Sequence, residues 1–157
     1  MTLKKLCTFY SSNSAIVAKS WVGQLGFDYK KCGDMIIAVD FDGTCVKHRY
    51  PMVGEDVDGA VSVLKELVRK GHKIILYTMR GGDTLDDAIS WFIDNDIELW
   101  GINRNPEQYG WSLSPKVFAN LYIDDAALGI PLIEPEDDRD YVDWNRVRDI
   151  LITKNVI

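Results

Sequence analysis

The stretch MIIAVDFDGT, residues 35–44, joins a short apolar run to two aspartates, a glycine and a threonine. Apolar, β-branched runs of this length are typical of strands that are buried on both faces of a parallel sheet. The stretch therefore predicts a central parallel strand over residues 35–40, with Asp40 and Asp42 at its carboxyl end. Because side chains alternate along an extended backbone, we expect both carboxylates on one side of the chain and Phe41 on the other.

A helix is predicted to follow this strand. Apolar residues recur with helical spacing between Val57 and Val68. Asp56 and Asp58 suit the first turn of that helix, where carboxylates face the positive end of the helix dipole. Gly71 suits the position just beyond its last turn, where a positive φ angle is common.

Strands and helices continue to alternate along the chain. We expect a second helix over residues 85–92, capped by Asp83 or Thr84, and a closing helix over residues 142–151 after the acidic stretch 134–140. Further strands are predicted at residues 73–77, 97–102 and 120–123. This order favours an α/β fold with a Rossmann-like, doubly wound and mainly parallel sheet that has helices on both faces. Ligands of such sheets bind beyond the carboxyl ends of the strands.

The composition limits the class of protein. A chain of 157 residues with 46% apolar and 27% charged residues suits a single globular domain. We assign residues 35–157 to this domain and residues 1–34, which fit the alternation poorly, to an N-terminal extension. The net charge of −6 disfavours nucleic acid and anionic membranes as partners, although it leaves a local basic groove open.

The apolar runs and the cysteines indicate the compartment. No apolar run is long enough to span a bilayer, so we expect no membrane partner. The three cysteines lack the spacing of a disulfide framework or of a zinc site. We therefore expect a cytoplasmic protein with reduced thiols.

Acidic side chains follow two of the predicted strands. Asp40 and Asp42 end the first strand, and Asp124 and Asp125 come directly after the strand predicted at residues 120–123. Two carboxylates about 4 Å apart repel each other by roughly 1 kcal/mol in water and about 4 kcal/mol at an effective dielectric constant near 20. A divalent cation relieves this repulsion, and an all-oxygen ligand set favours Mg²⁺ over zinc. If the two strands are neighbours, these carboxylates converge on one Mg²⁺ site.

Groups that suit a phosphate lie beside other predicted strands. The strand at residues 73–77 is followed by TMRGG, in which the Thr78 hydroxyl and free backbone N–H groups could hold phosphate oxygens. Arg80 could bind the same phosphate with two parallel hydrogen bonds. Lys116, shortly before Asp124, adds a positive charge. Each feature alone also fits a turn, a helix cap or a solvated surface, so the prediction depends on their conjunction.

These segments resemble the motifs of the haloacid dehalogenase-like (HAD) hydrolases, from residue 35 to about residue 130. The matches to the four motifs of that superfamily are, in order, DFDGT at residues 40–44, Thr78, Lys116 and the pair Asp124-Asp125. Within the superfamily, the stretch DFDGTCVKHRYPMVGE resembles a small group of bacterial and phage members without a cap domain. The short interval between Thr44 and the first predicted helix leaves little room for a cap.

The resemblance implies a role for each matched residue. Asp40 would be the nucleophile that forms an aspartyl-phosphate. Asp42 would be the general acid that protonates the leaving oxygen and then activates water. Mg²⁺ would be held by Asp40, the backbone carbonyl of Asp42 and Asp124, with Asp125 in a supporting role. The remaining matches would bind the phosphoryl group: Thr78 and Lys116.

The predicted activity is therefore Mg²⁺-dependent hydrolysis of a phosphomonoester, either a small molecule or a macromolecule. Two alternatives remain: a nucleotide or polynucleotide end phosphatase, and a catalytically idle HAD-like domain that binds or regulates a partner. An open site of this kind is also compatible with a homo-oligomer in which a second subunit covers the substrate. His48, Arg49 and Tyr50 lie in the loop expected to flank the entrance, where they could contact substrate or be solvated.

Overall fold

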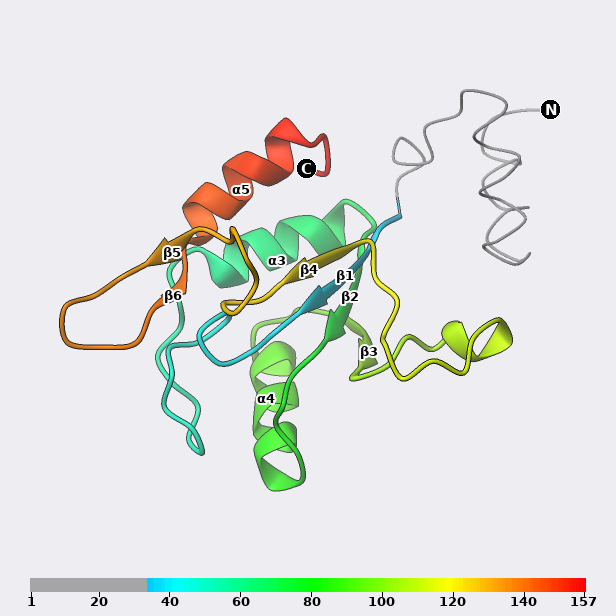
Figure 1. Ribbon diagram of the computed structural model, residues 1–157, viewed down its shortest axis with the longest axis horizontal. Helices are drawn as coiled ribbons and strands as arrows, with labels where there is room; N and C mark the ends of the chain where they lie inside the picture. Colours follow the sequence, from blue (N-terminus) through cyan, green and yellow to red (C-terminus); the bar gives the residue numbers. More distant parts are fainter. Residues whose placement is uncertain (1–33) are drawn as a thin grey trace.

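The computed structural model describes residues 34–157 (Figure 1). The N-terminal extension predicted over residues 1–34 therefore lies outside the described residues, except for its last residue. Four strands form one parallel sheet in the order β3-β2-β1-β4: β1 (Ile36–Val39), β2 (Lys73–Leu76), β3 (Leu99–Ile102) and β4 (Leu121–Ile123). The predicted α/β class with a mainly parallel, Rossmann-like sheet is confirmed.

The strand order reverses at β1. From β1 the chain proceeds to β2 and then β3 on one side, and it returns to place β4 on the other side of β1. The pairing of β1 with β4 continues just past the strand ends, because the Asp40 N–H donates to the Ile123 carbonyl at 2.9 Å. A sheet that reverses in this way opens a crevice beyond the carboxyl ends of the two strands at the reversal. Here those strands are β1 and β4.

The main core lies on one face of the sheet. Ile37 and Val39 of β1, with Ile74 and Leu76 of β2, pack against buried residues of three helices. These helices are α3 (Ala60–Arg69), α4 (Asp83–Asp94) and α5 (Trp144–Thr153). The alternate residues of the same strands, Ala38 and Ile75, are buried outside this core cluster and belong to the opposite face.

No described α-helix covers that opposite face, so the predicted cover of helices on both faces is wrong for residues 34–157. The connection from β3 to β4 contains only the short 3-10 helix η2 (Gln108–Gly110). Pro106 from this connection and Ile75 from β2 both lie against Gly101 of β3. Val117, also in the connection, is buried. Irregular chain of this connection therefore packs on the opposite face.

The helix after β1 begins later than predicted. Gly59, with a φ angle of 84°, precedes its first residue, Ala60. Asp56 and Asp58 therefore lie before the helix rather than in its first turn. Asp56 has a different partner, since its carboxylate accepts a hydrogen bond from Trp91 Nε1 at 2.7 Å. The predicted end is confirmed by Gly71, which has a φ angle of 93° just beyond the last turn.

Neither predicted cap of α4 is in the capping position. Gly82 precedes the helix, and Asp83 and Thr84 are its first two residues. The Thr84 hydroxyl donates to the Gly81 carbonyl at 2.9 Å.

The acidic stretch 134–140 connects the two strands of an antiparallel ribbon, β5 (Leu132–Ile133) and β6 (Tyr141–Val142). This ribbon was not predicted, because strands of two residues carry no periodic pattern. No helix of the described residues is both long and apolar enough to cross a membrane.

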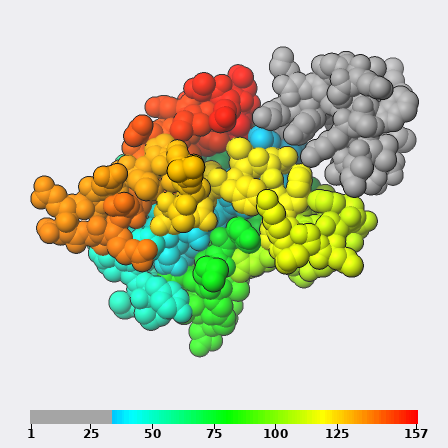
Figure 2. Space-filling model, viewed as in Figure 1, coloured from blue at the N-terminus to red at the C-terminus, as the bar shows by residue number. Residues whose placement is uncertain are grey.

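A hairpin-like loop over residues 46–56, called hairpin 46–56 below, projects between β1 and α3. Its ends pair in antiparallel fashion, with a bridge between Val46 and Asp56 and a 2.8 Å hydrogen bond from the Lys47 N–H to the Glu55 carbonyl. On the surface it lies beside the segment that follows β2 (Figure 2), where Arg80 donates to the Met52 carbonyl at 2.8 Å. The carboxyl ends of β1 and β2 are therefore flanked by this hairpin.

The closing helix is joined to the loop that follows β1 through Trp144. This fully buried side chain donates from Nε1 to the Thr44 carbonyl at 2.7 Å.

Trp144→Phe leaves that carbonyl without its partner, so we expect the free energy of unfolding to fall by about 1–3 kcal/mol in urea titrations. The control is Trp111→Phe at a 38% exposed site, where the variant keeps a ring against Phe118. Equal stability of the two variants would contradict this role of the indole N–H.

Candidate active site

Three aspartates meet where β1 and β4 end side by side. Asp40 follows β1, and Asp124 and Asp125 follow β4; each offers a carboxylate oxygen, and these oxygens all lie within 4.8 Å of one another. The predicted convergence of Asp40 and Asp124 is therefore present in the structure, and Asp125 joins them. The carboxylate of Asp42 does not belong to this group, called the aspartate cluster below.

Thr44 and His48 hold the aspartate cluster together. The Thr44 hydroxyl donates to Asp40 Oδ2 at 3.2 Å and accepts from the Asp125 N–H at 3.1 Å. His48 Nε2 lies 3.0 Å from Asp125 Oδ2, within hydrogen-bond distance. His48 therefore contacts the cluster itself, a role that differs from the predicted alternatives of substrate contact or solvation. Thr44 is the last residue of the DFDGT motif, and that motif was the available signal for it.

Within the described residues, no lysine or arginine forms an ion pair with the aspartate cluster, and His48 contacts only Asp125. The pKa of the Asp40 carboxyl is raised from 3.8 to about 7, mainly by burial and to a smaller extent by the charges of Asp124 and Asp125. Hydrogen bonds from the Phe41 N–H and the Thr44 hydroxyl lower the pKa but do not compensate. A group of hard oxygen donors with uncompensated negative charge is the donor set that suits Mg²⁺. The residues present therefore fit the predicted metal.

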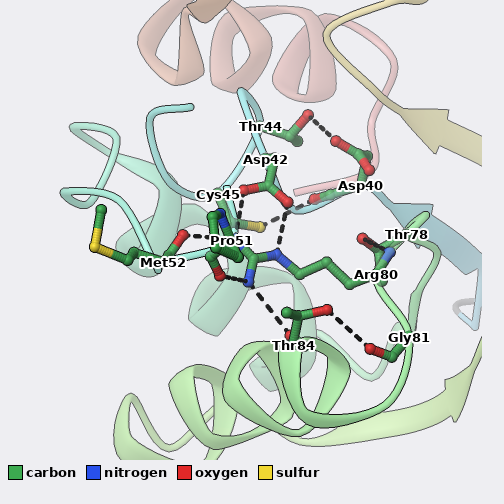
Figure 3. Close-up of polar contacts among 10 residues, drawn as sticks. All are labelled: Asp40, Asp42, Thr44, Cys45, Pro51, Met52, Thr78, Arg80, Gly81 and Thr84. Carbon is green, nitrogen blue, oxygen red and sulfur yellow. Dashed lines mark hydrogen bonds and ion pairs between the residues drawn. The ribbon is translucent and has the colours of Figure 1, made fainter. Parts of the chain in front are cut away.

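Asp42 is paired with Arg80 instead (Figure 3). Arg80 Nε lies 2.7 Å from Asp42 Oδ2, and Arg80 Nη2 lies 2.7 Å from Asp42 Oδ1. The prediction placed Asp40 and Asp42 together around one cation. In the structure their carboxylates have separate partners, because a guanidinium neutralises one and the other remains in the cluster. This arrangement leaves the backbone carbonyl as the part of Asp42 that is assigned to a metal.

Arg80 has no donor left for a phosphate. Besides its two bonds to Asp42, Nη1 donates to the carbonyls of Pro51 at 3.0 Å and Thr84 at 3.3 Å, and Nη2 donates to that of Met52 at 2.8 Å. A guanidinium carries five N–H donors, so all are used within the protein. The side chain is 1% exposed. The predicted phosphate-binding role of Arg80 is therefore not supported by this arrangement.

Thr78 keeps its predicted position beyond β2. Its N–H donates to Asn103 Oδ1 at 2.8 Å, and its hydroxyl oxygen accepts from the Arg80 N–H at 3.2 Å. Within residues 34–157 the hydroxyl proton has no hydrogen-bond acceptor. Sequence reasoning missed Asn103, which holds this loop with a φ angle of 50°. An asparagine directly after a predicted strand was a usable signal, since asparagine tolerates positive φ angles.

Lys116 is exposed in the connection that leads to β4. Its carbonyl accepts a hydrogen bond from Gln108 Nε2 at 2.8 Å. Among the described residues, no carboxylate lies within ion-pair distance of its ammonium group. The structure therefore does not bring Lys116 into contact with the aspartate cluster, and its phosphate-binding role stays a prediction.

Hairpin 46–56 is attached on two sides. Arg49 forms a double hydrogen bond with Asp138 of the ribbon connection, at 3.1 and 2.9 Å, and Arg80 holds the carbonyls of the hairpin tip. Tyr50 is 67% exposed, and the centre of its ring lies 5.4 Å from the Arg80 guanidinium carbon. Of the three loop residues expected to contact substrate or be solvated, only Tyr50 is free of a polar partner among the described residues.

Comparison with known proteins identifies a relative through its structure. No family model matches the chain, and a search of curated proteins finds no match. A solved structure of a conserved protein coded by a locus of Bacteroides thetaiotaomicron is 38% identical, with a TM-score of 0.65, over 77% of this chain and 92% of the other. The two proteins belong to one family. The Bacteroides protein is described only as conserved, so this kinship shows the fold and the family, and the function has to be argued from the site.

Gly43 provides a sharp test of how tightly the cluster is packed. Its φ angle is 83°, and an added Cβ would collide with His48 Nε2 and lie 2.6 Å from Asp125 Oδ2. We expect Gly43→Ala to lower the free energy of unfolding by about 2 kcal/mol or more, measured in urea, because strain and collision add. Gly110→Ala is the matched control, since a Cβ there meets no atom within 4 Å. A stability equal to that of the control would contradict the packing around Gly43.

Asp40 makes stability without metal depend on pH. The folded state holds a proton on Asp40 up to about pH 7, whereas the unfolded chain releases it near 3.8. The folded state therefore binds more protons within this window, and stability falls as the pH rises through it. With a chelator present at about pH 8, Asp40→Asn should exceed the wild type by about 2–4 kcal/mol in urea titrations, and the gap should vanish near pH 4.

The exposed variant Asp94→Asn, at the end of α4, is the control for this measurement and should show no such trend. Added Mg²⁺ should reverse the order at about pH 8, because a cation that binds only the folded wild type stabilises it. An Asp40→Asn variant that is less stable than the wild type in chelator would contradict the unbalanced charge of the cluster.

Proposed function

We propose that the protein is a Mg²⁺-dependent phosphomonoester hydrolase of the HAD-like type that acts through an aspartyl-phosphate. The observation that carries this proposal is the aspartate cluster at the carboxyl ends of β1 and β4, with Asp42 two residues beyond Asp40. A pair of carboxylates in different environments suits one nucleophile and one proton carrier. The four HAD-like sequence motifs support the same assignment.

Asp40 is the proposed nucleophile. Its carboxylate attacks the phosphorus atom, the bond from phosphorus to the leaving oxygen breaks, and Asp42 gives a proton to that oxygen. Water then attacks the phosphorus of the aspartyl-phosphate while Asp42 takes a proton from it. Phosphate leaves, the Asp40 carboxylate is restored, and Asp42 again holds a proton.

The other residues bind and orient the reactants. Asp40, Asp124 and the backbone carbonyl of Asp42 would hold Mg²⁺, with Asp125 in support. When bound, the cation offsets the repulsion between the attacking carboxylate and the phosphate dianion. The remaining phosphate ligands in this proposal are Thr78 and Lys116. Thr44 keeps Asp40 in place through its hydroxyl, and this fixed position favours in-line attack.

The proposed substrate is a phosphomonoester in the cytoplasm. The net charge of −6 disfavours a polynucleotide, so we favour a small phosphorylated molecule over a nucleic acid as the substrate. The alternative of a binding or regulatory module predicts capture of a partner without turnover of any phosphoester. A second subunit that covers the site would make turnover depend on protein concentration.

Asp40→Asn tests the proposed nucleophile. We expect Mg²⁺-dependent release of phosphate from p-nitrophenyl phosphate and a panel of phosphorylated metabolites to fall by more than about a thousandfold, because the amide cannot form the aspartyl-phosphate. The fold should be retained, as circular dichroism would show, and Asp94→Asn should keep the full activity. A chelator should abolish wild-type turnover. Undiminished turnover by Asp40→Asn would exclude this nucleophile.

A further inference from the structure

We propose that Arg80 is a positioning residue that sets the orientation of the Asp42 carboxylate toward the leaving oxygen of the substrate. Hydrogen bonds to three separate segments of the chain hold the Arg80 guanidinium in place. This inference rests on the proposed function, because it assigns the support for the proton carrier. The test below addresses the step in which the leaving group departs.

Every N–H donor of the Arg80 guanidinium is used in a hydrogen bond. Of the five hydrogen bonds, two go to Asp42, two to the tip of hairpin 46–56 and one to the first turn of α4 (Figure 3). Its guanidinium carbon lies 5.1 Å from the centre of the Phe41 ring and 5.4 Å from that of the Tyr50 ring. Rotation of the guanidinium would break several of these contacts at once. The group is therefore a rigid support.

A rigid support matters for Asp42 because a proton carrier works only within hydrogen-bond reach of the atom that it serves. An aspartate side chain has two rotatable bonds, and the two parallel bonds from Arg80, both 2.7 Å long, fix both of them. Each Asp42 oxygen keeps a second lone pair beside the one that accepts from Arg80. Arg80 thus determines the orientation of the carboxylate, and with it the direction of these free lone pairs.

Arg80 makes no hydrogen bond to the nucleophile among the described residues. Asp40 is held by the Thr44 hydroxyl and by the backbone bond to Ile123, which do not involve Arg80. A change at Arg80 should therefore weaken the proton transfer to the leaving oxygen more than the attack on phosphorus. Substrates that leave easily without a proton should be affected least.

Arg80→Lys tests this inference, since a lysine ammonium cannot form the two parallel bonds. We would measure kcat/KM with p-nitrophenyl phosphate, phenyl phosphate and an alkyl phosphate, in order of increasing need for a proton on the leaving oxygen. We expect the loss for the alkyl phosphate to exceed that for p-nitrophenyl phosphate by about tenfold or more. A purely structural role would lower all three by the same factor, and that result would overturn the inference.

Arg49→Lys is the matched control. Arg49 also donates two hydrogen bonds to an aspartate, Asp138, and also fixes hairpin 46–56, yet it does not contact Asp42. Its variant should show no dependence on the leaving group. An equal dependence in both variants would assign the effect to the hairpin and overturn the role of Arg80.

Two further results complete the test. Should Arg80→Lys fail to fold, Tyr50→Ala at the exposed side of the guanidinium should show the same trend with a smaller loss, and a uniform loss there would overturn the inference. Failure of the proposed function has a different outcome: wild-type protein that hydrolyses none of the three substrates with Mg²⁺ contradicts that function and the inference together. Wild-type turnover with a uniform Arg80→Lys loss contradicts the inference alone.

Discussion

The mutual repulsion of three carboxylates within 4.8 Å of one another is the constraint on which the site depends. Asp40, Asp124 and Asp125 come from two strand ends that the parallel pairing of β1 and β4 holds side by side. The surrounding contacts keep them together: the Thr44 hydroxyl bridges the two strand ends, and His48 Nε2 lies within hydrogen-bond distance of Asp125. A folded protein keeps such an arrangement at a cost in stability, which a bound cation can offset.

The two aspartates of the DFDGT motif have different surroundings although they are two residues apart. Asp40 is partly buried among other carboxylates, and the pKa of its carboxyl is raised to about 7. Asp42 is bound through both oxygens to a guanidinium whose remaining donors are used by hairpin 46–56 and α4. Opposed environments of this kind allow two chemically identical groups to carry different steps of one reaction.

Local sequence was sufficient for the four strands of the parallel sheet and for the three α-helices, but it was insufficient for their limits and for the two-residue strands β5 and β6. The apolar run before Asp40 and the helical spacing after Val57 are strong because a buried face requires them over several residues. The start of α3 was misplaced because Asp56, which suits a helix start by charge, is bonded to Trp91 across the structure. The prediction of helices on both faces of the sheet was also wrong. The loop that takes up the opposite face buries Val117, and a loop has no periodic pattern to detect.

The sequence by itself determined the parallel strand that ends in two carboxylates and the second acidic pair after another strand, because these features depend on neighbours along the chain. Only the tertiary structure decided which carboxylates share a site. The order of the strands placed β4 beside β1, which joined Asp124 and Asp125 to Asp40. Arg80 lies 38 residues from Asp42 in sequence, and its bonds could be assigned only once the fold had placed three segments around one guanidinium. A guanidinium binds phosphate and carboxylate with the same geometry, so sequence alone could not distinguish these partners.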